Sequence, residues 1–461
     1  MRKKKKLLTI LLAVCLVAAM MPSMVFAANA KSDDIVVLYT NDVHCGIDDS
    51  IGYAGLAAYK ADKLKETKNV VLVDAGDAIQ GDLAGALSKG DYIVDIINQV
   101  GYDVAVPGNH EFDFGMDQFL ALTKKSNAKY ISSNFTDTKA NKTVFDPYVI
   151  KELGGKKVAF VGISTPESIT KSTPAFFQDE KGNYIYDFCN DKTGKKLYKA
   201  VQNAIDAAKA EGADYVIALG HMGIDDQSKP WTSREVIANT TGLNAFIDGH
   251  SHSTVASEAV KDKDGKEVTL SQTGTKLAAI GELIITADGK ISTSLVTDYA
   301  AKDEKTASLI KEVKDKIEAV SSKKVGTSEV LLTTLDAEGK RAVRNQETTM
   351  GNFCADAYRI IGGADIGVVQ GGGVRADIKA GDVTYGDIIA LHPWGNMYGV
   401  IEATGQQILD ALELGARSTP DEVGGFLQVS GISYEIDTTV PSTVVTDENA
   451  MFVKVAGARR V

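Results

Sequence analysis

The chain has 461 residues, of which 44% are hydrophobic and 24% are charged, and its formal net charge is −11. These values are typical of a globular protein with two or three domains, and they exclude fibrous and intrinsically disordered classes. An acidic surface repels phosphate backbones, so we expect no binding to a nucleic acid duplex, and a phosphate-bearing ligand would need a local cation.

Residues 1–30 have the pattern of a secretory signal peptide. A basic start at residues 2–6 precedes an apolar stretch at 7–21, and small residues typical of a cleavage site follow. An uncleaved membrane anchor is the alternative. No later segment approaches the ~20 apolar residues of a membrane span. We therefore expect a secreted, extracytoplasmic protein without a transmembrane span after cleavage, for which association with the cell surface or cell wall stays open.

The next part of the chain, residues 31–302, alternates short apolar runs with amphipathic stretches. The apolar runs, rich in Val, Ile and Leu, predict strands that are buried on both faces. They lie at 35–39, 70–73, 104–106, 158–163, 215–219 and 245–247. Helical patterns lie between them at 53–65, 195–211 and 233–239. The alternation predicts an α/β domain with mostly parallel sheets.

Residues 303–326 predict a helix that connects two domains. A narrow apolar stripe at helical spacing runs through charged residues and consists of Ile310, Val313, Ile317 and Val320. A second, smaller α/β region is expected at 327–461. The sequence stops directly after a predicted strand at 451–456, which favours the interpretation that this second region is truncated at its C-terminus.

Five of the six histidines fall in short segments that directly follow predicted strands. They are His44, His110, His221, His250 and His252. The carboxyl ends of parallel strands meet at one edge of a sheet, so we expect these side chains to converge. In Asp42-Val43-His44 and His250-Ser251-His252, alternate residues of an extended segment point the same way and can reach one ion.

The candidate donors combine carboxylate, amide oxygen and imidazole, with no thiolate. This chemistry favours Mn, Zn, Co, Fe or Mg over a structural zinc site. Seven donors exceed the needs of one ion, so we expect two divalent metal ions. Two such ions about 3.5–4 Å apart can activate a water molecule and stabilise the oxyanions of an in-line displacement.

Five short blocks, in this order, resemble the signature of calcineurin-like metallophosphoesterases: Asp42-Val43-His44, Gly76-Asp77, Gly108-Asn109-His110-Glu111, Gly220-His221 and Gly249-His250-Ser251-His252. The longer strings at 38–44 and 108–115 resemble the secreted 5′-nucleotidase family, which includes UDP-sugar hydrolases and 2′,3′-cyclic nucleotide phosphodiesterases. The resemblance implies an α/β/β/α sandwich followed by a smaller α/β nucleotide-binding domain. It also implies that Asp42, His44, Asp77 and His252 hold one ion. The other ion would take Asp77, Asn109, His221 and His250.

The resemblance further implies that His110 is not a metal ligand. It would pair with Asp113 and face the phosphate, so the expected catalytic residues are His110, Asp113 and Asn109. A carboxylate that accepts a ring N–H fixes the imidazole's orientation and favours its protonated form. Such a cation can stabilise charge on a transferred phosphoryl group or assist the leaving oxygen. The alternative is a purely structural His–Asp bond.

The resemblance continues into the second region through strings at 344–352, 371–375 and 393–396. It implies that Arg344 and Arg375 bind the anionic part of a nucleotide, for which guanidinium geometry is suited. Trp394 would stack on the base, with a core tryptophan as the alternative. The remaining expected substrate-binding residues are Asn352, Gly372, Gly373 and Asn396, although the glycine run could equally be only a tight turn.

The sequence thus predicts a secreted hydrolase that removes phosphate from nucleoside 5′-monophosphates by metal-activated water attack. A UDP-sugar hydrolase or a 2′,3′-cyclic nucleotide phosphodiesterase with the same centre is the alternative. A nucleotide-binding surface protein without catalysis is an alternative of another class. The complete ligand set and the His110–Asp113 pair argue against it, because binding alone does not need that pair.

Overall fold

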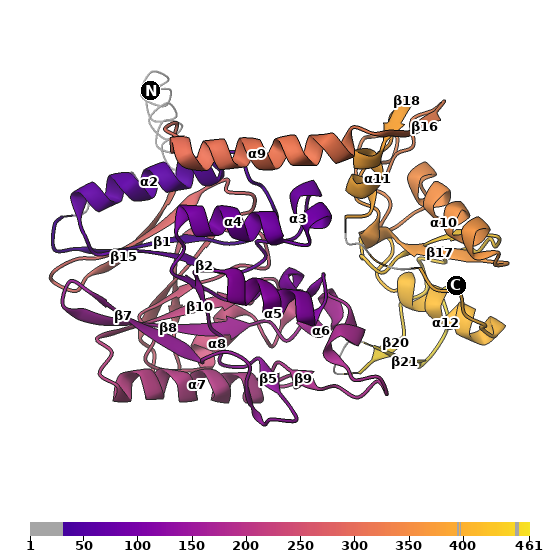
Figure 1. The fold of residues 1–461 in the computed structure, drawn as a ribbon. Helices are drawn as coiled ribbons and strands as arrows, with labels where there is room; N and C mark the ends of the chain where they lie inside the picture. Colours follow the sequence, from indigo (N-terminus) through magenta and orange to yellow (C-terminus); the bar gives the residue numbers. More distant parts are fainter. Residues whose placement is uncertain (1–30, 394–395, 397, 448–450) are drawn as a thin grey trace, which may run out of the picture.

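The computed structural model describes residues 31–393, 396, 398–447 and 451–461 (Figure 1). The predicted signal segment and Trp394 therefore lie outside the described residues. Within the described ranges, no helix is both long enough and apolar enough to cross a membrane.

The first sheet has six strands in the order β15-β14-β1-β2-β3-β4. Four of them run parallel: β1 (Ile35–Thr40), β2 (Val70–Asp74), β3 (Val104–Ala105) and β4 (Lys129–Tyr130). The other two, β14 (Ile280–Ile285) and β15 (Ile291–Val296), add on antiparallel beside β1.

The second sheet also has six strands, in the order β12-β13-β11-β10-β8-β7. Its inner strands run parallel: β8 (Lys156–Ser164), β10 (Tyr215–His221), β11 (Ala245–Ile247) and β13 (Glu267–Thr273). The two edge strands, β7 (Tyr148–Leu153) and β12 (Thr254–Lys261), are antiparallel. The mostly parallel arrangement expected from the apolar runs is therefore present in both sheets.

The two sheets pack face to face, and helices cover both outer faces. Between the sheets lies a layer of buried side chains that includes Val37, Val73, Phe160 and Leu219. The outer face of the first sheet is covered by α2 (Gly52–Glu66), α4 (Asp91–Val100) and α5 (Met116–Lys125). The outer face of the second is covered by α7 (Lys195–Ala210) and α8 (Ser233–Asn239) (Figure 1). The predicted α/β/β/α sandwich is confirmed.

Shorter elements complete the sandwich. They are α3 (Leu83–Ser88), η1 (His110–Phe112), α6 (Ser168–Lys171), η2 (Pro174–Phe177), η3 (Asp226–Ser228), and a small sheet of β5 (Thr136–Asp137), β6 (Lys142–Thr143) and β9 (Tyr186–Asp187).

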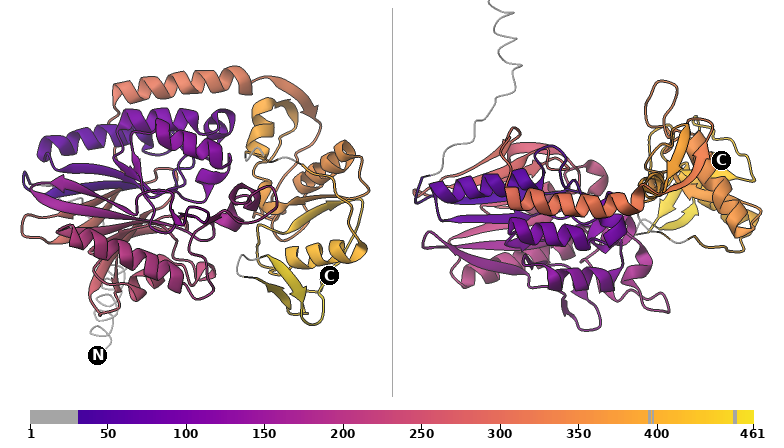
Figure 2. Two further views of the ribbon diagram at one scale, coloured as in Figure 1. Left: turned by 60° about the horizontal axis from the view of Figure 1, so that its bottom comes forward. Right: turned by 45° about the horizontal axis from the view of Figure 1, so that its top comes forward.

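The helix expected to connect the two regions is α9 (Glu304–Ser321), which begins after an Asp303 side chain that accepts from the backbone N–H of Thr306. Ile310 and Val313 are buried against the first helical layer, whereas Val320 near the far end is 47% exposed. The helix lies along α2, and its C-terminal end reaches the second region (Figure 2). The apolar stripe thus docks α9 onto the sandwich through Ile310, Val313 and Ile317.

The second region is a smaller α/β assembly around Val343, Met350, Cys354 and Val369. Its two-stranded sheets pair β16 (Lys324–Ser328) with β18 (Gly381–Thr384), β17 (Gly367–Gln370) with β19 (Leu427–Ser430), and β20 (Val444–Thr446) with β21 (Phe452–Val455). Its helices are α10 (Thr349–Gly362), α11 (Tyr385–Leu391) and α12 (Gly405–Gly415), with the short η4 (Gly371–Gly373) after β17.

Candidate metal centre

Both sheets deliver candidate ligands to the same edge of the sandwich. Asp42 and His44 follow β1, Asp77 follows β2, and Asn109 follows β3. His221 is the last residue of β10, while His250 and His252 follow β11. The structure therefore places all seven sequence-predicted ligands at the carboxyl ends of parallel strands, where loops converge.

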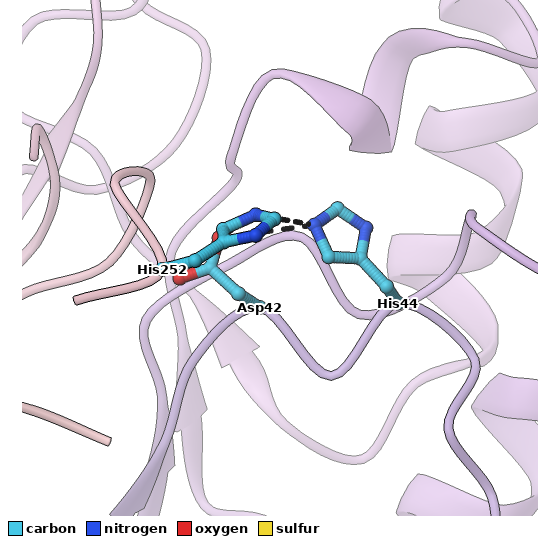
Figure 3. Close-up of side chains that lie close together, drawn as sticks. All are labelled: Asp42, His44 and His252. Carbon is cyan, nitrogen blue, oxygen red and sulfur yellow. Dashed lines mark hydrogen bonds and ion pairs between the residues drawn. The ribbon is translucent and has the colours of Figure 1, made fainter. Parts of the chain in front are cut away.

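The first group of donor atoms comes from Asp42, His44 and His252, which can each offer one atom within 4.8 Å of the others (Figure 3). The two histidine Nε2 atoms are 3.0 Å apart, and Nε2 of His252 is 3.5 Å from Oδ1 of Asp42. The Nδ1–H of His44 donates to the main-chain oxygen of Gln80 at 2.9 Å, which leaves Nε2 with its lone pair. Burial lowers the pKa of His44 to about 3, so its ring is neutral near pH 7.

The second group comes from Asp77, His221 and His250. The Nδ1–H of His221 donates to the main-chain oxygen of Ala75 at 2.7 Å, and its Nε2 is 3.0 Å from Oδ2 of Asp77. The same Asp77 oxygen is 3.8 Å from Nε2 of His44. Asp77 therefore faces both groups at once.

The residues present fit divalent cations. Oδ1 of Asn109 is buried and has no hydrogen-bond partner in the part of the chain that is described, a situation that costs roughly 1–3 kcal/mol unless a cation is nearby. Burial raises the pKa of Asp42, and the adjacent Asp77 carboxylate raises it further. Burial alone would lower the pKa of His221, but the charges of Asp77 and Asp42 raise it to about 10. Positive charge is thus stabilised at this point, and the mixed oxygen and imidazole donors suit hard or borderline metals.

The ligand loops have an unusual backbone conformation. Five of the candidate ligands have positive φ: Asp42 (51°), His44 (46°), Asp77 (59°), His250 (81°) and His252 (53°). Non-glycine residues in the left-handed region are uncommon and gather at functional sites.

Glycines and one glutamate hold these loops together. A Cβ atom on Gly108 would lie 2.2 Å from Oδ1 of Asp77, so only glycine fits there. The buried Glu111 carboxylate accepts backbone N–H groups of Asp77 (2.8 Å), Ala78 (2.8 Å) and Gly108 (2.6 Å). Sequence reasoning missed the role of Glu111, although its place inside the block at 108–115 was a signal.

His110 and Asp113 form the expected pair beside the ligand groups. Nδ1 of His110 is 2.6 Å from Oδ2 of Asp113, and the ring of His110 packs edge-on at 5.2 Å from that of His44. Burial alone would lower the pKa of His110, but the Asp113 and Asp77 carboxylates outweigh it and raise the pKa to about 9. The hydroxyl of Ser172 donates to the other oxygen of Asp113 at 2.7 Å, a contact that the sequence did not predict.

Glu167 is a second residue that sequence reasoning missed. Its Oε2 lies 2.9 Å from Nε2 of His250. Burial alone would raise the pKa of Glu167, but the hydrogen bond and charge of His250, aided by Lys171, lower it to about 2, so the side chain is a carboxylate. The two residues are 83 positions apart in the chain, and no spacing pattern connects them.

In the second region, Arg344, Arg375 and the glycine run lie together. The backbone N–H of Gly372 donates to the oxygen of Gly424 at 2.8 Å, and Arg375 donates to the oxygen of Gly372 at 3.4 Å. Gly373 lies in the same short η4 turn. Burial, followed by the charges of Arg341 and Arg375, lowers the pKa of Arg344 to about 10. The result is a partly buried cationic cluster.

The other expected substrate residues are placed differently. Asn352 on α10 donates to Oε1 of Glu347 at 2.7 Å, and Asn396 is exposed. Within the described ranges, no hydrogen bond joins either asparagine to the arginines. The second region touches the metal centre through Gln80, whose Nε2 donates to the oxygen of Pro393 at 3.5 Å.

Comparisons with known proteins agree with this geometry. A family model described as calcineurin-like phosphoesterase matches residues 35–254, and one described as 5′-nucleotidase, C-terminal domain, matches residues 324–453. A 5′-nucleotidase precursor from Thermus thermophilus has a similar structure, with a TM-score of 0.71 over 92% of this chain and 87% of that chain at 24% identity, a likeness that shows the fold.

Two curated relatives cover most of this chain. The trifunctional nucleotide phosphoesterase protein YfkN of Bacillus subtilis is 28% identical over 87% of the chain, which spans only 29% of that protein's length. The 5′-nucleotidase of Vibrio parahaemolyticus is 28% identical over 87% of the chain and 78% of its own length. Residues 35–254 thus belong to the calcineurin-like phosphoesterase family and residues 324–453 to the 5′-nucleotidase C-terminal domain family, and the chain is a metal-dependent phosphoester hydrolase.

Proposed function

We propose that this protein releases phosphate from nucleoside 5′-monophosphates. The observation that carries the proposal is the pair of ligand groups facing Asp77, with His110 and Asp113 directly beside them. The cationic cluster of Arg344 and Arg375 supports a phosphate-bearing substrate. In the reaction, water adds to phosphorus, the bond from phosphorus to the 5′-oxygen breaks, and nucleoside and inorganic phosphate leave.

Two divalent ions fit the ligand set. Asp42, His44 and His252 would hold one, Asn109, His221 and His250 the other, and Asp77 would contribute to both. Ions bound there supply Lewis acidity toward the phosphoryl oxygens and make water a nucleophile at neutral pH. The protein's part is to hold these side chains in place through Gln80, Ala75 and Glu111.

The role of His110 follows from its hydrogen bonds. Asp113 accepts the hydrogen bond from Nδ1–H, and the protonated ring also carries an Nε2–H, which would donate to an oxygen of the phosphoryl group or to the leaving 5′-oxygen. Ser172 fixes the other oxygen of Asp113 and so limits rotation of the pair.

Phosphate release tests the proposal. Purified protein is freed of metal with a chelator, reloaded with Mn²⁺, and supplied with AMP, UDP-glucose or 2′,3′-cyclic AMP. We expect the highest kcat/KM with AMP. Preference for UDP-glucose or the cyclic nucleotide would contradict the proposed substrate but leave the proposed metal centre in place. If metal-loaded protein binds AMP but hydrolyses none of the three, the chain is a nucleotide-binding protein.

A variant separates catalysis from metal binding. His110→Ala should lower kcat for AMP by about 10²–10⁴-fold while metal content per chain stays constant. Equal turnover in the variant would remove the role assigned to His110.

We also propose that the protein acts outside the cytoplasm. The basic and apolar pattern of residues 1–30 supports this proposal. N-terminal sequencing of the protein recovered from its native cells tests it, because export with cleavage predicts a mature chain that starts near residue 30. A chain that starts at Met1 in the cytoplasmic fraction would contradict it.

A further inference from the structure

A histidine that binds a metal through one ring nitrogen commonly has its other ring nitrogen held by a hydrogen bond. In this site, two of the candidate ligands are held by main-chain oxygens: His44 by Gln80 and His221 by Ala75. A main-chain carbonyl is available whatever the side chain at that position, so these two contacts depend on the fold alone.

His250 is held in another way. Its Nε2 is 2.9 Å from a side-chain oxygen of Glu167, which immediately precedes α6. Both side chains are largely buried, with 10% and 12% of their surfaces exposed. Because Nε2–H donates to the carboxylate, Nδ1 is the nitrogen left for an ion. The backbone N–H of His250 donates to Asp42, so the residue is fixed at both ends.

His252 presents the contrast. Its side chain is 46% exposed, and its Nε2 faces Asp42 and His44. In the part of the chain described by the structure, no hydrogen bond holds its Nδ1. The two donor groups are therefore unequal: one is buried and supported by a carboxylate, and the other is open to solvent at His252.

We propose that Glu167 is a positioning residue that fixes the ring of His250 and makes the Asp77, His221 and His250 position hold its ion more tightly than the Asp42, His44 and His252 position. A carboxylate that accepts the outer N–H fixes the tautomer and increases the basicity of the ligating nitrogen. The inference rests on the metal assignment of the proposed function and is independent of the nucleotide substrate.

A purely structural role predicts something different. In that case the Glu167–His250 bond only ties the loop after β8 to the loop after β11. Removing it would lower the free energy of unfolding and leave metal affinity unchanged. Metal binding and stability must therefore be measured on the same samples.

The test is a Mn²⁺ titration of metal-free protein by calorimetry, with metal content after dialysis as a second measurement. Wild-type protein should show two classes of site. Glu167→Ala should weaken the tighter class by about 10- to 100-fold and leave the weaker class unchanged, and Glu167→Gln should fall between the two because it keeps an acceptor oxygen. His252→Ala should remove the weaker class and thereby identify it.

The matched control is Asp226→Asn, which removes an exposed carboxylate from the nearby η3 turn. It should leave both classes unchanged. The absorption spectrum of Co²⁺ in the tighter class should also change in Glu167→Ala, since the geometry of one imidazole ligand changes.

Three results would overturn the inference: a single class of site in wild-type protein, unchanged affinities in Glu167→Ala, or equal losses in both classes. Nucleotide hydrolysis is measured separately. A protein that keeps the two-class pattern but releases no phosphate from AMP contradicts the proposed function and leaves the role of Glu167 standing.

Discussion

At the scale of single residues, the candidate ligands could be singled out from the sequence, but the backbone conformation that orients their side chains could not. Residue type and place after an apolar run were enough to single out Asp42, His44 and Asp77. Their positive φ angles depend on bonds between loops, such as Asp42 N–H to Gly76 oxygen and His44 N–H to Asp77 oxygen, both 2.9 Å. Such conformations cost of order 1–3 kcal/mol each and persist only where neighbouring loops hold them.

The same limit explains why the roles of Glu111 and Glu167 were not predicted from the sequence. Glu167 is far along the chain from His250, and Glu111 acts on backbone N–H groups, which no residue pattern displays. Sequence reasoning found the groups that would touch the ions and missed the groups that hold them.

Gly108→Ala tests the close approach at the ligand loop. The new Cβ would meet Oδ1 of Asp77 at 2.2 Å and displace that carboxylate. A displacement of about 1 Å lowers turnover by roughly 100-fold. We expect a loss of this size in kcat/KM for AMP together with weaker Mn²⁺ binding. Gly405→Ala, at a position with no neighbour within 4 Å, serves as the control and should behave like wild type.

Glu111→Gln tests the buried acceptor. An amide keeps one acceptor oxygen but directs an NH₂ group at backbone donors, so at least one N–H loses its partner. The free energy of unfolding should fall by about 1–3 kcal/mol in a denaturant titration. A midpoint equal to wild type would show that the loops do not depend on this carboxylate.

At the scale of elements, six parallel strands were predicted to within two residues, whereas the parallel strands β4 and β13 were not predicted. The run at 70–73 became β2 (Val70–Asp74), and the run at 245–247 became β11 without change. The antiparallel edge strand β12 was missed because it alternates exposed and partly buried residues and is rich in polar side chains. In the second region, the strand predicted at 451–456 is β21 (Phe452–Val455), and the other strands of the two-stranded sheets are too short to leave a periodic pattern.

The apolar stripe on α9 differs in burial along its length. Its early residues pack on the sandwich, and its last member reaches solvent where the helix runs on toward β16.

Ile310→Ala and Val320→Ala separate these parts of α9. Ile310 is 5% exposed, so truncation leaves a cavity and should cost about 2–5 kcal/mol of unfolding free energy. Val320 is 47% exposed, and its truncation should change stability by less than about 0.5 kcal/mol. Thermal denaturation of both variants checks the difference. Equal effects would mean that α9 does not dock through Ile310.

At the scale of the whole molecule, the candidate site depends on both halves of the sandwich. Asp42, His44, Asp77 and Asn109 come from the first sheet, and the remaining three ligands come from the second. Neither sheet alone can supply a complete donor set for two ions.

Metal removal should therefore lower the stability of the protein as well as its activity. A ligand present at 100 times its dissociation constant stabilises the folded state by about 2.7 kcal/mol. We expect chelation to lower the melting temperature and Mn²⁺ to restore it. His221→Ala should show a smaller metal-dependent shift. A melting temperature that does not respond to metal would contradict binding at this edge.

The position of Asp77 between the two groups has one more consequence. An ion shared by Asp77 and His221 joins two strands of different sheets that are distant in sequence, so it acts as a removable cross-link across the sandwich. Closing a long loop restricts the unfolded chain, as a disulfide does. Loss of this ion would remove the cross-link and the catalytic centre together. The stability of the folded protein would then depend on the metal content of its surroundings.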